Sequence, residues 1–272
     1  MYNAKTIFKI IKVLSKSPER LLRVMDEETD KKEYVIKKYG LFQGMPVVDL
    51  LSIFPGFSET VEPYSFLDGT SMLTDLALLK SLVRMHEECS YLEIGTWRGE
   101  SVANVAKIAK NCVTLSLSEE EMRSLGFGED FIKNNKFFSE KLNNVEHIGH
   151  DSRSFDFSKL NKKFDVIFID GDHHYETVKI DTQNAYPLLR DEKSVIVWHD
   201  YGFGPETVRW SVLAGILDGS PKDRIDSIYH ISNTMCAVYM KDNFETSHLK
   251  KFNVPDKFFK VKIFAEKLKN IV

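Results

Sequence analysis

Cysteine is scarce in this sequence. Cys89, Cys112 and Cys236 lie far apart, and none belongs to a C-x-x-C pair. Such sparse and scattered cysteines disfavour a disulfide framework and a cysteine-rich zinc site. We expect buried free thiols in a protein of the reducing cytoplasm.

Long hydrophobic runs are also missing, and none approaches the roughly 20 residues that span a bilayer. Residues 1–14 mix lysines with apolar residues at helical spacing, and no signal-peptide cleavage site follows. We expect no stable membrane insertion. An amphipathic helix packed on its own domain or on a second subunit is favoured, and a helix on the membrane surface is the alternative.

Charge of one sign is not in excess. The chain has 37 Lys and Arg against 40 Asp and Glu, a formal net charge of −3. This balance gives no electrostatic basis for a nucleic-acid partner. With 43% hydrophobic and 28% charged residues, the chain has the composition of a globular protein with one sizeable core.

The pattern of helix starts and breaks divides the chain into three parts. Residues 1–60 are predicted to form a helical extension, a lid or a dimer contact, in which Ser17-Pro18-Glu19 begins a helix and Gly40 ends it. Residues 61–245 are predicted to form the main domain, and residues 246–272 a helical tail. A dimer contact would make the protein a homo-oligomer.

Helices and short apolar strands alternate from about residue 70. The predicted strands lie at residues 91–95, 113–117, 144–148, 164–170, 194–198, 228–231 and 235–240, with helical segments between most of them. Such alternation is typical of an α/β, Rossmann-like doubly wound sheet with helices on both faces. The last two strands follow each other closely, which predicts one antiparallel edge strand in a mostly parallel sheet.

The first predicted strand ends in a glycine turn, Gly95-Thr96-Trp97-Arg98-Gly99. Glycines there let the backbone turn tightly and approach a ligand at a helix N-terminus. Dinucleotide-binding turns have the pattern G-x-G-x-x-G, whereas this turn is G-x-x-x-G. A nicotinamide-dependent oxidoreductase is therefore disfavoured.

Polar residues lie at or just after the ends of the next four predicted strands. The candidates are Ser116, Ser118 and Glu119 at the second strand, Asp151 and Ser152 at the third, Asp170 and His173 at the fourth, and His199 and Asp200 at the fifth. The carboxyl ends of parallel strands meet at one edge of a sheet, so these groups should converge. We expect Asp170, His199 and Asp200 to form a site for Mg²⁺ or another divalent cation, and His173 to act as a general base.

Four segments carry a resemblance to a known family. They are Tyr91–Gly99, Gly149–Arg153, Phe164–His173 and Val195–Tyr201. Over roughly residues 66–242 the sequence resembles class I S-adenosylmethionine-dependent O-methyltransferases. It is most similar to bacterial enzymes of sugar, surface-polysaccharide and macrolide-type biosynthesis, and more distantly to catechol and caffeoyl-CoA O-methyltransferases.

The resemblance implies a cofactor site for S-adenosylmethionine (SAM). Residues implied to contact it are Gly69, Thr70, Glu93, Gly95, Thr96, Gly99, Ser116, Asp151, Ser152 and Asp170. Ser116 stands where relatives have an acid for the ribose hydroxyls, a role that Ser118 or Glu119 could take if the strand ended later. His199 stands where many relatives have Asp or Glu, and His173 where the catechol-type enzymes have a lysine base.

The resemblance implies transfer of a methyl group to a hydroxyl of a sugar, glycan or other small molecule. A catalytically inactive scaffold or cofactor-binding protein with the same fold is the alternative. Ser116 and His199 are the features that favour it.

Overall fold

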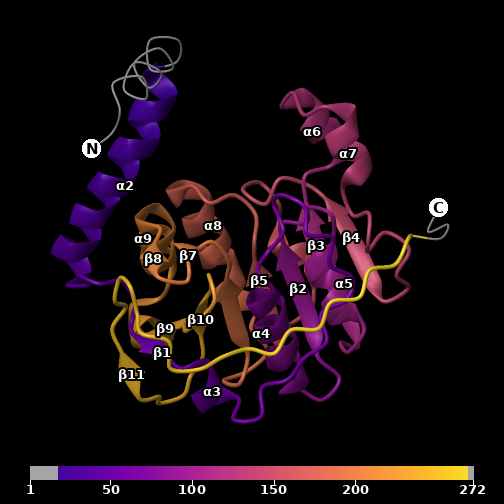
Figure 1. Ribbon diagram of the computed structural model, residues 1–272. Helices are drawn as coiled ribbons and strands as arrows, with labels where there is room; N and C mark the ends of the chain where they lie inside the picture. The colour runs from indigo at the N-terminus through magenta and orange to yellow at the C-terminus, as the bar shows by residue number, and fades with distance from the viewer. Residues whose placement is uncertain (1–17, 269–272) are drawn as a thin grey trace, which may run out of the picture.

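The computed structural model describes residues 18–268, and a nine-stranded sheet forms the centre of this part of the chain (Figure 1). In spatial order its strands are β11 (Thr246–Ser247), β1 (Val47–Val48), β9 (Ile228–Ile231), β10 (Ala237–Tyr239), β6 (Val195–Trp198), β5 (Val166–Ile169), β2 (Ser90–Ile94), β3 (Asn111–Ser116) and β4 (Val145–Gly149).

Most of the sheet is parallel, as predicted. Strands β6, β5, β2, β3 and β4 run in one direction, and β10 is antiparallel to both of its neighbours, β6 and β9. Beyond β10 the sheet continues through β9 and β1, which are parallel, to the antiparallel β11. The strand order reverses between β2 and β5, which is the point where ligands bind in sheets of this kind.

Helices cover both faces of the sheet because alternate strand residues point to opposite sides. One core lies between the sheet and helices α4 (Leu73–Arg84) and α5 (Glu100–Ala106). The other lies between the sheet and α8 (Tyr175–Ala185) and α9 (Trp210–Gly219). Four shorter elements are α3 (Leu50–Ile53), α6 (Glu119–Ser124), α7 (Glu129–Asn134) and the β7–β8 hairpin (Gly202–Gly204 and Thr207–Val208).

The N-terminal extension contains the long helix α2 (Pro18–Tyr39), which packs against α9 (Figure 1). The helix is described from Pro18, the first residue that the structure describes, and ends before Gly40, as predicted; Gly40 has a φ of 71°. Within residues 1–60, however, β1 pairs with β9 and therefore belongs to the main sheet. The predicted amphipathic segment 1–14 lies outside the described residues.

The C-terminal tail differs from the prediction. Residues 246–268 contain β11 and extended chain, and no helix lies in this part of the structure. Two features explain the error: β11 pairs with β1, and Pro255 interrupts the following segment. Phe252 and Phe264 of the tail are exposed, so a helix here would have had no core to cover. In the described residues, no helix is long and apolar enough to cross a membrane.

Candidate functional site

The turn after β2 lies against the turn after β5. Gly95 has a φ of 95°, and a Cβ atom at this position would overlap the carbonyl group of Asp170. Gly99, the N-cap of α5, has a φ of 78°, and a Cβ there would come within 2.9 Å of the Ser139 Cβ. Glycine is therefore required at both positions, and at Gly95 the close neighbour is protein backbone. The sequence alone suggested that a ligand would occupy the space next to Gly95, whereas the structure places the Asp170 backbone there.

Glu93 precedes this turn and is completely buried in β2. Its carboxylate accepts hydrogen bonds from the Tyr91 hydroxyl at 2.7 Å and the Thr96 hydroxyl at 3.0 Å. Burial raises the pKa of Glu93 to about 7. The side chain thus fixes the start of the turn, whereas contact with a cofactor stays a prediction.

The segment before α4 lies over the β2 turn, as the implied roles of Gly69 and Thr70 require. A Cβ on Gly69 would lie 3.5 Å from the Trp97 indole nitrogen, and Arg98 donates a hydrogen bond to the Asp68 carbonyl oxygen at 2.8 Å. The Thr70 hydroxyl donates to a carbonyl oxygen of its own loop at 2.9 Å. The loop and the turn therefore form one unit.

The position after β3 differs from the sequence interpretation. β3 ends at Ser116, and Ser118 caps α6 while Glu121 reaches back to the backbone N–H of Ser118. Glu119 is exposed and pairs with Arg123 at 3.0 Å. The strand does not extend further, so the condition for a ribose role of Ser118 or Glu119 is not met. Ser116 is therefore the residue at the predicted ribose position, the end of β3. Its buried hydroxyl has no hydrogen-bond partner among the described residues.

The end of β4 is held by two carboxylates, one of which sequence analysis missed. Glu121 accepts a hydrogen bond from the Asp151 backbone at 3.2 Å, which links the ends of β3 and β4. The Asp151 carboxylate pairs with Arg153 at 2.6 Å, which lowers the pKa of Asp151. A ligand amine would have to share Asp151 with this guanidinium. The signal for Glu121 was the capping pattern Ser-x-x-Glu.

A further buried acid, Asp181 of α8, lies beneath the same loops. Its carboxylate has no hydrogen-bond partner among residues 18–268, and an added Cβ on Gly171 would lie 3.9 Å from it. Burial raises the pKa of Asp181 to about 7. Ser152, the other predicted adenine contact, lies near this carboxylate and opposes the rise in its pKa without making a hydrogen bond of good geometry.

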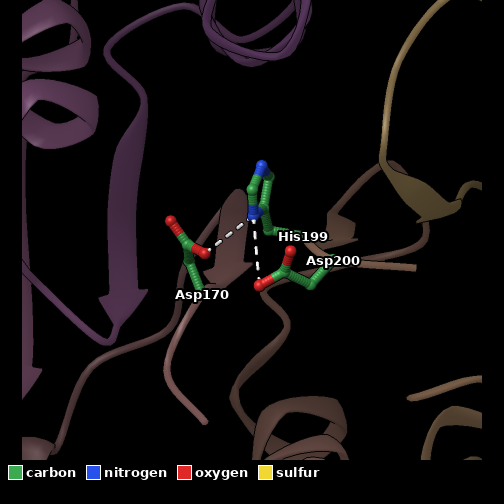
Figure 2. Close-up of side chains that lie close together, drawn as sticks. All are labelled: Asp170, His199 and Asp200. Carbon is green, nitrogen blue, oxygen red and sulfur yellow. Dashed lines mark ion pairs between the residues drawn. The ribbon is translucent and has the colours of Figure 1, made fainter. Parts of the chain in front are cut away.

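The predicted metal ligands meet at the ends of β5 and β6 (Figure 2). The His199 Nδ1 atom lies 3.0 Å from an Asp170 oxygen and 3.7 Å from an Asp200 oxygen. One ligand atom from each of the three residues lies within 4.8 Å of the others. Asp200 has a φ of 56°, a conformation that is uncommon outside glycine and that often marks functional sites.

Two residues that sequence analysis missed flank these three. Asp75 of α4 lies 3.1 Å from the His199 Nε2 atom, and Arg209 lies 3.6 Å from Asp200. Burial by itself would lower the pKa of His199. The carboxylates of Asp170, Asp200 and Asp75 outweigh burial and hold this pKa well above the usual value. Only the tertiary packing of α4 brings Asp75 to the site. Its one sequence signal was an acid inside an apolar helix.

These residues fit a divalent cation. The His199 Nδ1 atom is buried and has no hydrogen bond of good geometry within the described chain, although two carboxylates face it. An unpartnered nitrogen between carboxylates is the donor arrangement that a metal ion completes.

The two adjacent histidines differ in their surroundings. His174 precedes α8, and its ring contacts the Asp172 carboxylate. His173 stacks on His174 with ring centroids 5.0 Å apart. Partial desolvation, followed by the charge of Arg209, lowers the pKa of His173, so this exposed ring is neutral and able to accept a proton at pH 7.

The segment that contains most of these strand ends also has known relatives. Residues 92–201 match a methyltransferase domain family. The uncharacterized protein R132 of Acanthamoeba polyphaga mimivirus is 31% identical over 142 residues, which are 49% of this chain and 60% of the viral protein. The alignment therefore spans less than two thirds of that relative.

Two solved structures are similar. The O-methyltransferase from Bacillus cereus in complex with SAH is 18% identical, with a TM-score of 0.46 over 70% of this chain and 97% of that chain. The O-methyltransferase TomG from Streptomyces achromogenes, involved in tomaymycin synthesis and solved with SAM, is 16% identical. Its TM-score is 0.43 over 63% of this chain and 81% of that chain.

Proposed function

We propose that this protein transfers a methyl group from SAM to a hydroxyl oxygen of a sugar, glycan or other small molecule. The observation that carries the proposal is the methyltransferase match at residues 92–201, which includes the ends of β2 to β6. These ends lie beside the reversal of strand order, where such sheets bind ligands.

The methyl group of SAM is an electrophile when the cofactor is bound, so the protein must orient the acceptor and remove its proton. The turn from Gly95 to Gly99 and the loop that contains Gly69 form the proposed wall around the methionine end. His173 is the proposed general base, because its pKa is below the ordinary value and its neighbour His174 is already held by Asp172.

The proposed metal site consists of Asp170, His199 and Asp200. A cation held there would lower the pKa of an acceptor hydroxyl and hold its oxygen in place. An aliphatic hydroxyl is a weak acid, so a sugar acceptor would depend on this assistance more than a phenol would.

The alternative function is cofactor binding without turnover. The pairing of Asp151 with Arg153 and the serine at position 116 favour it, because both leave fewer free acids for the adenosine. Turnover assays separate the two functions. The protein is incubated with SAM and a panel that contains a hexose, a nucleotide sugar and a catechol, and S-adenosylhomocysteine (SAH) is measured. Acceptor-dependent SAH formation supports methyl transfer, and SAM binding without turnover of any acceptor supports the alternative.

A further inference from the structure

The two ring nitrogens of His199 face different groups. Nδ1 points between Asp170 and Asp200, and the other ring nitrogen points away from both carboxylates (Figure 2). That second nitrogen, Nε2, lies 3.1 Å from Asp75. The residue is only 8% exposed, so water has little access to either nitrogen.

Asp75 is held in place by two backbone groups as well. Its carboxylate accepts hydrogen bonds from the backbone of Met72 and of Met235, each at 2.9 Å. These bonds join the first turn of α4 to the segment before β10, and Asp75 is 2% exposed. The acid therefore has little freedom to move away from His199.

A carboxylate can only accept a hydrogen bond, so the nitrogen facing Asp75 must carry a hydrogen. The carboxylates around His199 favour a hydrogen on each ring nitrogen, and a cation bound between Asp170 and Asp200 would displace the one on Nδ1. Because Asp75 keeps the other hydrogen on Nε2, Nδ1 is the nitrogen whose lone pair becomes available to the cation. An orienting carboxylate behind a histidine ligand is a common device in metal sites, because it fixes the ring and raises its basicity.

We propose that Asp75 is a positioning residue that makes His199 a metal ligand, and that the site prefers a transition-metal ion such as Mn²⁺ over Mg²⁺. The inference rests on the metal site of the proposed function. Two carboxylates and an imidazole suit Mn²⁺, which accepts nitrogen ligands, whereas Mg²⁺ favours oxygen ligands in an octahedral shell. Without a lone pair at Nδ1, the two carboxylates alone would still bind Mg²⁺ weakly.

The test compares the two ions in the unsubstituted protein and in Asp75→Asn. If the amide nitrogen faces His199, it donates to Nε2 and moves the ring hydrogen to Nδ1, and if the amide oxygen faces His199, it holds the Nε2 hydrogen more weakly than a carboxylate does. Either orientation makes Nδ1 a poorer metal ligand. Calorimetric titration should show tighter binding of Mn²⁺ than of Mg²⁺ by the unsubstituted protein. In Asp75→Asn the affinity for Mn²⁺ should fall about 10–100-fold. The affinity for Mg²⁺ should change far less.

Asp165→Asn is the matched control. Asp165 is also a buried acid that accepts from a backbone N–H, that of Ser90 at 2.7 Å, but it lies at the opposite end of β5 from the site. Its substitution should leave the Mn²⁺ to Mg²⁺ affinity ratio unchanged. The ¹⁵N shifts of the His199 ring provide a second readout: they should report a hydrogen on Nε2 while Asp75 is present, and they should change in Asp75→Asn.

Three results would overturn the inference. They are an equal loss of affinity for both ions in Asp75→Asn, an unchanged affinity for Mn²⁺, and no binding of Mn²⁺ by the unsubstituted protein. SAH binding, measured on the same samples, separates this failure from failure of the proposed function. If SAH binds while the metal result is negative, the cofactor site of the proposed function stands and the role of Asp75 does not.

Discussion

Substituting Gly95 by alanine tests how the β2 and β5 turns fit together. The positive φ of 95° costs a non-glycine residue about 1–2 kcal/mol. The new Cβ would also overlap the Asp170 backbone, and forced overpacking typically costs about 1–3 kcal/mol. We therefore expect Gly95→Ala to lose about 2–5 kcal/mol of unfolding free energy. The metal site next to the turn should also be displaced, because the atom that must move belongs to Asp170.

Gly40→Ala is the matched control for this prediction. Gly40 has a φ of 71°, but nothing lies within 4 Å of an added Cβ. The Gly40→Ala variant should lose only the unfolding free energy that the positive φ costs, about 1–2 kcal/mol. Urea unfolding measures both variants, and SAH titration measures the effect of each on ligand binding. Equal losses of stability, or unchanged SAH binding in Gly95→Ala, would refute the reasoning.

Three further predictions concern catalysis, metal and the N-terminal helix. His173→Ala should lower turnover by about 10²–10⁴-fold and His174→Ala far less; equal losses would assign the base elsewhere. The lowered pKa of His173 means that it stays neutral below the usual histidine pKa of about 6.5, so kcat should fall only at more acidic pH. EDTA should suppress turnover, and Asp200→Ala should do the same, whereas full activity in chelator contradicts the metal site. Asp218 accepts hydrogen bonds from the hydroxyls of three tyrosines and from the Lys38 ammonium group. Burial raises the pKa of Asp218, but these hydrogen bonds, that from Lys38 first, outweigh burial and lower the pKa. Its contribution to stability should be complete above about pH 4 and lost as the pH falls further, and Asp218→Asn should remove this dependence from urea unfolding curves.

The central sheet could be predicted because its strands are short apolar runs separated by helical patterns. β5 and β6 have every residue buried, which is the sequence signature of a strand covered on both faces. The two-residue strands β1 and β11 could not be predicted, because pairing with β9 and with each other creates them. Their short sequences have no periodicity of their own.

The metal ligands could be predicted for a geometric reason. Ile169 lies opposite Trp198 in parallel strands, so the residues that follow them, Asp170 and His199, must lie side by side. Asp75 and Arg209 could not be predicted, because tertiary packing alone brings α4 and the start of α9 to this edge of the sheet.

The ribose position shows how local chemistry can mislead. Glu119 was a candidate because an acid near the end of β3 matched the expected role. The Ser118–Glu121 capping interaction begins α6 at Glu119, which turns that side chain toward Arg123 and solvent. Applied to this segment, the helix-start rule would have identified Glu121 as the inward-facing acid.

Calorimetric titration of the unsubstituted protein with SAH and, separately, with NAD tests the central claim most directly. We predict saturable binding of SAH at one site and no heat of binding for NAD, because the β2 turn has the pattern G-x-x-x-G in place of the G-x-G-x-x-G of a dinucleotide site. Tight binding of NAD with no response to SAH would contradict it.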